Sequence, residues 1–398
     1  MNFKNLLLTV IVLLLPIGIF SCEKVDPMDE DPMLENPAIP ETLECNRLVE
    51  EGASLTLEDR GDGIDYIIDC VASVRGDLII DPGVTIQFGT DAGIDVDGTG
   101  SIQALGTTQD QVVFTGEDKI AGAWKGILID SNDPKNKIEY ATIEYAGGDA
   151  FNSNNNQGAV IVWSDTRLNM NNTTITNSKT YGFNASYGGD DLSLDNNTIT
   201  ACDAPMYIEG SYPTTISRGS YTGNTLDAII IQADQITGTH NWANLGVPYH
   251  VTSGLTVRAG GTLTIMPGAV LKFGQDSRLY INEGASGPKP SLIAVGTATE
   301  PIVFTSIDNT LSAWRGIYFD SPSSLNEIGF TTIENASNGE QDGAIEMWYG
   351  TVLNVHDVLF KNVANCAIQQ FISGGGTNTL TTNNLSFDNV GTEGICQN

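Results

Sequence analysis

The chain has 398 residues, and 18 Lys and Arg stand against 49 Asp and Glu, which gives a formal net charge of −31. A surface of this charge repels phosphate backbones, so nucleic acid is excluded as a partner. In a secreted protein such acidity mainly provides solubility, and divalent-cation binding is the more specific alternative.

The N-terminus has the pattern of a secretory signal. Lys4 supplies a positive charge, and a mainly apolar stretch runs from Leu6 to Phe20, followed by Ser21 and Cys22. The stretch is too short and wrongly flanked for a stable membrane span. Its ending resembles a bacterial lipobox, which implies a signal peptide over residues 1–21 and lipidation of Cys22.

Residues 22–45 combine acidic side chains with prolines, a composition typical of an extended, flexible tether. The lysine and acids directly after Cys22 resemble the surface-export signal of Bacteroidota-type lipoproteins. We therefore expect a protein anchored by lipid in the outer membrane and facing the cell exterior.

The remaining chain repeats itself. The segment 66–89 returns as 249–274, and the Pro-Gly pair recurs after 185 residues (267 − 82). The offset rises to 190 at the Trp-Lys/Arg-Gly-Ile motif (314 − 124), across an insertion at residues 284–290, and then returns to 185. Such duplication predicts two related halves, residues 46–240 and 241–398.

A finer period lies within each half. Leu168, Leu192 and Ile216 are spaced by 24 residues each, and they lie in short apolar segments separated by Gly, Asn, Asp and Ser. Strands of three to five residues cannot bury an apolar face alone, but they can when each stacks on its copy in the next turn. No long helical period competes, so the pattern predicts a parallel β-solenoid. Asn at the corners tolerates left-handed backbone angles and can bond to its copy one turn away.

The recurring run L-x-I-x-P-G-x-x-I/L-x-F is followed by Val112–Thr115 (or Ile302–Thr305) and then by W-K/R-G-I. Together these motifs resemble right-handed parallel β-helix surface lipoproteins of Bacteroidota type, within the pectate-lyase-like superfamily. The resemblance covers almost everything from Gly63 onward. It implies an all-β, right-handed parallel β-helix, but this scaffold carries lyases, hydrolases, adhesins and inert proteins alike.

Five cysteines remain after Cys22. Cys45 and Cys70 flank the start of the body and are candidates for a disulfide that clamps it. Cys366 and Cys396 lie on neighbouring turns with opposite inward and outward parity, which argues against a bond between them. Cys202 is expected to be a small core residue.

Catalytic motifs are sparse. The three histidines show no catalytic pattern, and the hallmark motifs of polygalacturonases, serine hydrolases, zinc proteases and phosphate-binding loops are missing from the sequence. No cofactor is expected, with Ca²⁺ as the alternative. The segment Asp91–Gly100 reads as an ordinary strand with Asp95 and Asp97 toward solvent.

The closest approach to a lyase site is an acidic cluster with a base. Its catalytic candidates are Arg167, Asp191 and Asp165, and its metal candidates are Asp190, Asp191 and Asp195. A 24-residue turn places Arg167 and Asp191 on adjacent coils, about 4.8 Å apart. A surface salt bridge explains that pair equally well.

Aromatic residues give the positive signal. If the charged Glu346 faces out, Ile345 and Met347 face in and Trp348 faces out. The same parity places Trp163 outside, and Tyr187 and Phe371 follow these rings one turn later. Stacked outward rings form a platform that suits sugar faces, unless corner loops fold over them. Trp124 and Trp314 precede a turn glycine in the repeat and are expected to be structural.

Three functions remain open from the sequence. The first is a non-catalytic, monomeric surface lipoprotein whose β-helix binds an extracellular polysaccharide, another glycan or a surface protein, with Trp163, Tyr187, Trp348 and Phe371 as ligand-binding residues. The second is a polysaccharide lyase or glycoside hydrolase. The third is a structural or cell-contact adhesin.

Overall fold

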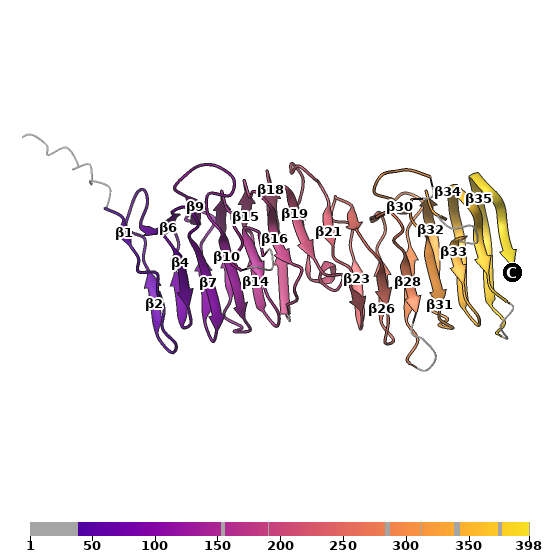
Figure 1. The fold of residues 1–398 in the computed structure, drawn as a ribbon, viewed down its shortest axis with the longest axis horizontal. Coiled ribbons are helices and arrows are strands. Elements are labelled where there is room, and N and C mark those ends of the chain that lie inside the picture. Colours follow the sequence, from indigo (N-terminus) through magenta and orange to yellow (C-terminus); the bar gives the residue numbers. More distant parts are fainter. Residues whose placement is uncertain are drawn as a thin grey trace, which may run out of the picture. The chain divides into compact units, whose positions relative to one another are not determined.

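Short parallel strands, each paired with the strand one turn further along the chain, make up most of the structure (Figure 1). The computed structural model describes residues 39–152, 156–189, 191–282, 287–311, 313–337, 343–372 and 376–397. The expected signal peptide, the lipidation site Cys22, most of the tether and the metal candidate Asp190 lie outside these residues.

Three ladders of strands form the first part of the fold, and the chain visits them in turn. The first ladder contains β1 (Glu41–Thr42), β3 (Tyr66–Ile68), β6 (Thr85–Phe88), β9 (Val112–Gly116), β12 (Ala141–Glu144), β15 (Thr174–Thr176), β18 (Asn197–Thr200) and β20 (Gly219–Ser220). The second contains β4 (Val71–Val74), β7 (Gly93–Gly98), β10 (Gly126–Ser131), β13 (Val160–Val162), β16 (Tyr181–Ala185) and β19 (Ala204–Ile208). The third contains β2 (Ser54–Leu57), β5 (Asp77–Ile80), β8 (Ser101–Leu105), β11 (Lys137–Glu139), β14 (Arg167–Asn171) and β17 (Asp191–Asp195).

The later strands again follow a three-ladder order. One ladder contains β21 (Ile229–Ile231), β24 (Tyr249–Val251), β27 (Val270–Phe273) and β30 (Ile302–Ser306). Another contains β22 (Gln235–Ile236), β25 (Leu255–Val257), β28 (Leu279–Asn282), β31 (Ile317–Asp320) and β33 (Gly343–Met347). The last begins with β23 (Thr239–Trp242), β26 (Thr262–Ile265) and β29 (Ser291–Val295). The long strands β32 (Glu327–Glu334), β34 (Val352–Gln370) and β35 (Thr379–Gln397) each join more than one ladder.

The predicted all-β class with parallel, stacked strands is therefore confirmed, and the arrangement is consistent with a β-solenoid. Within the described residues the only helical element is the 3-10 turn η1 (Tyr212–Thr215). No helix in that part of the chain is long and apolar enough to cross a membrane.

The predicted stacking of equivalent residues holds for Leu168 and Leu192, which pair across β14 and β17. The prediction for Ile216 is wrong, because Ile216 pairs with Leu194 instead. The turn η1 precedes Ile216 and changes the number of residues in this coil, so a fixed spacing of 24 fails here.

Inward side chains form one continuous core, while their neighbours along each strand point outward. Trp124 and Trp314 are fully buried, as predicted, and stack on Phe88 and Phe273 at centroid distances of 4.0 and 4.4 Å. Both indole N–H groups donate to a backbone carbonyl oxygen 20 residues later, at 2.9 Å. These repeated motifs thus adopt the same local structure.

The corner asparagines also behave as expected. Asn172 and Asn196 both have a left-handed φ, of 51° and 55°, and the Asn196 amide donates to Asn172 at 2.7 Å. Asn389 donates in the same way to Asn362 at 2.8 Å. Each link ties one coil to the next.

Two disulfides join neighbouring coils. The predicted Cys45–Cys70 bond is present, with Cα atoms 5.8 Å apart, and Cys202 is a buried free thiol as expected. The argument against a Cys366–Cys396 bond is wrong, because the structure contains that disulfide. The register between β34 and β35 shifts on both sides of Cys366, so simple alternation of inward and outward positions does not hold there.

The boundaries expected from the sequence do not coincide with breaks in the fold. The strand β1 pairs with β3, so ordered pairing begins at Glu41, inside the range assigned to the tether. The division between residues 240 and 241 falls within β23.

Candidate functional site: two outward rows

Five outward positions, contributed by five consecutive coils, form a row next to the core of the second ladder. We call this the first row: Arg75, Asp97, Asp130, Trp163 and Tyr187. Asp97 pairs with Asp130 across β7 and β10, and Arg75 forms a 3.0 Å ion pair with Asp97. The Trp163 amide donates to the Ile129 carbonyl, which places Trp163 beside Asp130.

An equivalent second row contains Arg258, Asn282, Asp320, Trp348 and Phe371. Asn282 pairs with Asp320 across β28 and β31. The amides of Trp348 and Phe371 donate to the carbonyls of Phe319 and Met347, so each ring follows its predecessor by one coil. Each member lies 183 to 190 residues after its counterpart (258 − 75 and 320 − 130), as the sequence repeat requires.

Strand alternation explains why these residues point outward. Val96, Ile129 and Val162 precede members of the first row and are fully buried. Ile281, Phe319 and Met347 do the same beneath the second row. Because neighbours along a strand point to opposite faces, these core residues hold the row members that follow them at the surface. Tyr187 lies one residue beyond this register, since Ser186 is the residue opposite Trp163.

The predicted ring pairs lie side by side at the surface. The Trp163 and Tyr187 rings are 4.5 Å apart and inclined by 23°, and Tyr187 is 40% exposed. The Trp348 and Phe371 rings are 4.9 Å apart and inclined by 49°, and both side chains are half-buried. Each pair offers part of its aromatic surface to solvent.

A corner loop covers neighbouring positions instead of the first ring pair. Within the loop 147–157, the described residue Gln157 accepts a hydrogen bond from the Asn184 amide at 2.9 Å, and Phe151 lies against Gly93. Leu128 and Ile161 point outward in the same ladder but are buried. The alternative that loops fold over outward side chains thus applies to these positions, whereas Tyr187 stays exposed.

The expectation that Glu346 faces solvent is wrong. Glu346 is only 3% exposed, and its carboxylate accepts hydrogen bonds from the Arg278 guanidinium at 2.6 and 3.1 Å. The same guanidinium lies over the rings of Tyr280 and Tyr318. Glu346 still points away from the core, since Ile345 and Met347 on either side are fully buried, so the parity that places Trp348 outside is retained.

The carboxyl groups near the first row have raised pKa values. Burial raises the pKa of Asp95 to about 6, with a further contribution from Asp97 and Asp130. Burial, Asp97 and Asp165 also raise the pKa of Asp130. The pKa of Glu209, one coil beyond the ring pair, is raised to about 7, by burial first and by Asp234 second. The predicted strand is confirmed as β7, in which Ile94 and Val96 are fully buried and Asp95 and Asp97 alternate with them, but Asp95 is half-buried and not fully solvated.

The structure does not bring all residues of the proposed lyase site together. Arg167 and Asp191 do pair in register across β14 and β17. Asp195 instead forms an ion pair with Arg218 at 2.8 Å, and hydrogen bonds from Ser217 and Arg218 lower its pKa. Asp165 lies at the corner before β14, where its charge acts on Asp130. Among the described residues, no group of three or more His, Cys, Asp or Glu is arranged to hold a metal ion.

None of the three histidines is a member of either row. Burial, with Lys272 nearby, lowers the pKa of His250 to about 4. The His356 ring contacts Glu327 at 3.2 Å and Asp357 at 2.9 Å.

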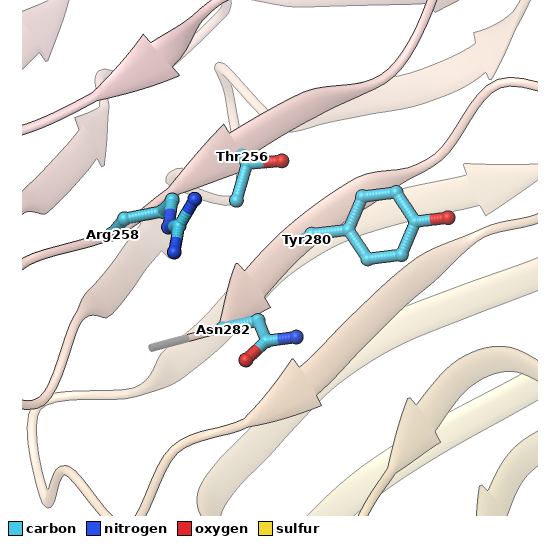
Figure 2. A pocket seen from close by; sticks show the side chains of 4 residues that line it. All are labelled: Thr256, Arg258, Tyr280 and Asn282. Atoms are coloured by element: carbon cyan, nitrogen blue, oxygen red, sulfur yellow. The ribbon is translucent and has the colours of Figure 1, made fainter. Parts of the chain in front are cut away.

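A pocket lies at the arginine end of each row. The first, of about 420 Å³, is lined by Glu51, Arg75, Asp97, Gly98, Thr99 and Asp130. The second, of about 340 Å³, is lined by Thr256, Arg258, Tyr280 and Asn282, whose side chains Figure 2 shows on neighbouring strands.

Sequence reasoning identified the ring pairs but missed the polar half of each row. The signal was available, because Arg75, Asp97 and Asp130 have Arg258, Asn282 and Asp320 at the offsets of the duplication. Comparisons with protein-family models, with curated proteins and with solved structures found no match for this chain.

Proposed function

We propose that this chain is a cell-surface lipoprotein whose β-helix binds a carbohydrate chain along its two outward rows, without catalysis. The observation that carries the proposal is the repetition of one pattern: a cation, a polar residue, a carboxylate and two aromatic rings, on five successive coils in each half. Core packing does not require this pattern, because all ten side chains point away from the core.

The chemistry of a row suits a sugar polymer. Aromatic faces such as those of Trp163 and Tyr187 supply contact area at low entropic cost and pack against the C–H faces of sugars. Asp130 beside them accepts hydrogen bonds from hydroxyl groups. Five coils span about 19 Å at the usual strand spacing, so the site favours a ligand that is extended in one direction.

The finer features of the fold belong to the same proposal. A right-handed coil is the expected hand for parallel strands joined by crossovers, and the duplicated motifs support a β-helix of two related halves within the pectate-lyase-like superfamily. A lipid on Cys22 would anchor this β-helix in the outer membrane, with the tether holding it toward the exterior.

The test is a glycan array probed with the wild-type protein and with Trp163→Ala and Trp348→Ala. We expect each single variant to lose binding at its own row and to keep it at the other. The double variant should lose at least about tenfold in affinity, the equivalent of 1.4 kcal/mol, because both stacking platforms disappear. Ile120→Ala is the matched control, since Ile120 is 64% exposed and belongs to neither row.

Unchanged binding by the double variant Trp163→Ala/Trp348→Ala would remove the basis for the proposal. The bound glycans should then be incubated with the wild-type protein, with and without EDTA. Release of reducing ends or of unsaturated uronates would support a hydrolase or a lyase instead.

A further inference from the structure

The two pockets at the arginine ends are equivalent in position but differ in charge. In the first pocket, Arg75 is surrounded by the carboxylates of Glu51, Asp97 and Asp130 and is ion-paired with Asp97. In the second pocket, Asn282 takes the place of Asp97, and none of the described lining residues, Thr256, Arg258, Tyr280 and Asn282, is acidic (Figure 2).

The guanidinium of Arg258 is available to bind an anionic group. Its side chain is exposed, and the guanidinium donates to the neutral amide oxygen of Gln235 at 3.2 Å. In the described parts of the chain, no carboxylate lies within ion-pairing distance of Arg258.

A second cation lies close to this end of the second row. Lys289 belongs to an insertion that the first half lacks, and its charge opposes the effect of burial on the pKa of Asp320. The adjacent Pro288 packs against Gly260, just after Arg258: a Cβ added at Gly260 would lie only 2.7 Å from that of Pro288. Of the insertion, the described residues Pro288 and Lys289 thus lie near this end of the second row, and the charge of Lys289 offsets that of Asp320.

We infer that the pocket of Thr256, Arg258, Tyr280 and Asn282 binds the carboxylate or sulfate group of an acidic sugar. This inference rests on the proposed carbohydrate function and specifies the ligand class of the second row. A guanidinium offers two parallel donors to such a group, and the hydroxyls of Thr256 and Tyr280 and the amide of Asn282 are further polar partners.

The same ligand would reach the aromatic pair of its row. Trp348 lies three coils beyond Arg258, about 14 Å at the usual strand spacing, so an oligosaccharide is needed to span both. The net charge of −31 does not prevent this, because exposed charges are screened within about 8 Å at physiological ionic strength and local charges decide the contact.

The experiment is calorimetric titration of the full mature chain with three tetrasaccharides: a uronic acid oligomer, its uncharged methyl ester and a sulfated oligomer. We expect the wild-type protein to bind a charged form about tenfold more tightly than the ester, and the tighter of the two charged forms identifies the group. Arg258→Gln should abolish this preference, lowering the affinity for the charged form about tenfold, to that for the ester. Asn282→Asp should do the same, because it installs the carboxylate that neutralises Arg75 in the first half.

Arg75→Gln is the matched control and should retain the preference for the acidic form. Ester binding without any charge preference, or a preference that persists in Arg258→Gln, would overturn the inference while carbohydrate binding stands. Absence of binding to all three forms would contradict the proposed function as well. Trp348→Ala should lower the number of ester molecules bound per chain from two to one, whereas Arg258→Gln should not, and this separates the stacking contact from the charge contact.

Discussion

Asp97 and Asn282 occupy the same place in the two rows, and this single change alters what each arginine can do. Asp97 forms an ion pair with Arg75 at 3.0 Å. Asn282, at the same position beside Arg258, is neutral and cannot neutralise the guanidinium charge. The side chains have nearly the same shape, so strand packing is unaffected. The two proposed sites would thus differ in ligand preference on one backbone arrangement.

Glu209 should make stability depend on pH. Its pKa in the folded protein is raised to about 7 from an ordinary value near 4.5, so the folded state binds more protons than the unfolded state between these values. The free energy of unfolding therefore falls as pH rises through this window. Glu209→Gln should raise the free energy of unfolding at pH 8 by about 1–2 kcal/mol, after allowing for partial solvent screening.

Urea denaturation of wild type and Glu209→Gln at several pH values measures this effect. The difference between the two proteins should shrink as pH falls toward 4.5. Asp234→Asn serves as the control, since Asp234 is only the second cause of the shift, and it should give a smaller gain. A constant difference at all pH values would contradict an origin in the titration of Glu209.

Alternation along a strand was sufficient to predict the outward rings, but it could not predict what covers an outward residue. Trp163 and Trp348 lie where the parity places them, whereas Glu346 is covered by Arg278, 68 residues earlier in the chain. His356 likewise meets Glu327 from the preceding coil, 29 residues away. Such contacts depend on the register of whole coils, which local sequence does not define.

At the level of strands and coils, the two disulfides are equivalent, because each joins a terminal coil to its neighbour. Cys45–Cys70 joins the coil that carries β1 to the next, and Cys366–Cys396 joins β34 to β35. A terminal coil pairs on one side only, so its strands lack half of the neighbours that stabilise an internal coil. Leu385, Phe387 and Val390 of β35 are accordingly only partly buried.

We expect Cys366→Ser/Cys396→Ser to loosen the C-terminal coil. The bond closes a separation of 30 residues, for which the usual stabilisation is about 2–4 kcal/mol. Hydrogen exchange should show faster exchange of the β35 amides, with protection of β7, β10 and β13 unchanged. Cys45→Ser/Cys70→Ser is the matched control and should affect β1 and β3 instead. Uniform loss of protection along the chain would argue against a local clamp.

The type and stacking of the strands followed from short-period repetition, because each turn must bury the apolar face of the next. Two irregularities did not follow from it. The turn η1 displaces Ile216 from the expected ladder position, and the register shifts around Cys366 permit a disulfide that parity excludes. Both arise where a coil changes length, and a mean period carries no information about single coils.

Across the whole described unit, the two halves do not continue in phase. Tyr66 and Tyr249 are equivalent in sequence, but β3 belongs to the first ladder, whereas β24 continues, through β21, the ladder of β19. The first row therefore lies along the ladder of β4, β7 and β10, and the second along that of β25, β28 and β31. The two proposed sites are therefore short and lie on different ladders.

This arrangement makes the number of ligands per chain the most direct measurement. We predict that a neutral oligosaccharide selected on the array binds the wild-type protein with a stoichiometry of two by calorimetric titration. Trp163→Ala and Trp348→Ala should each lower the stoichiometry to one, and the double variant should not bind. A wild-type stoichiometry that neither substitution changes, or full binding by the double variant, would contradict the assignment of the outward rows as the carbohydrate sites.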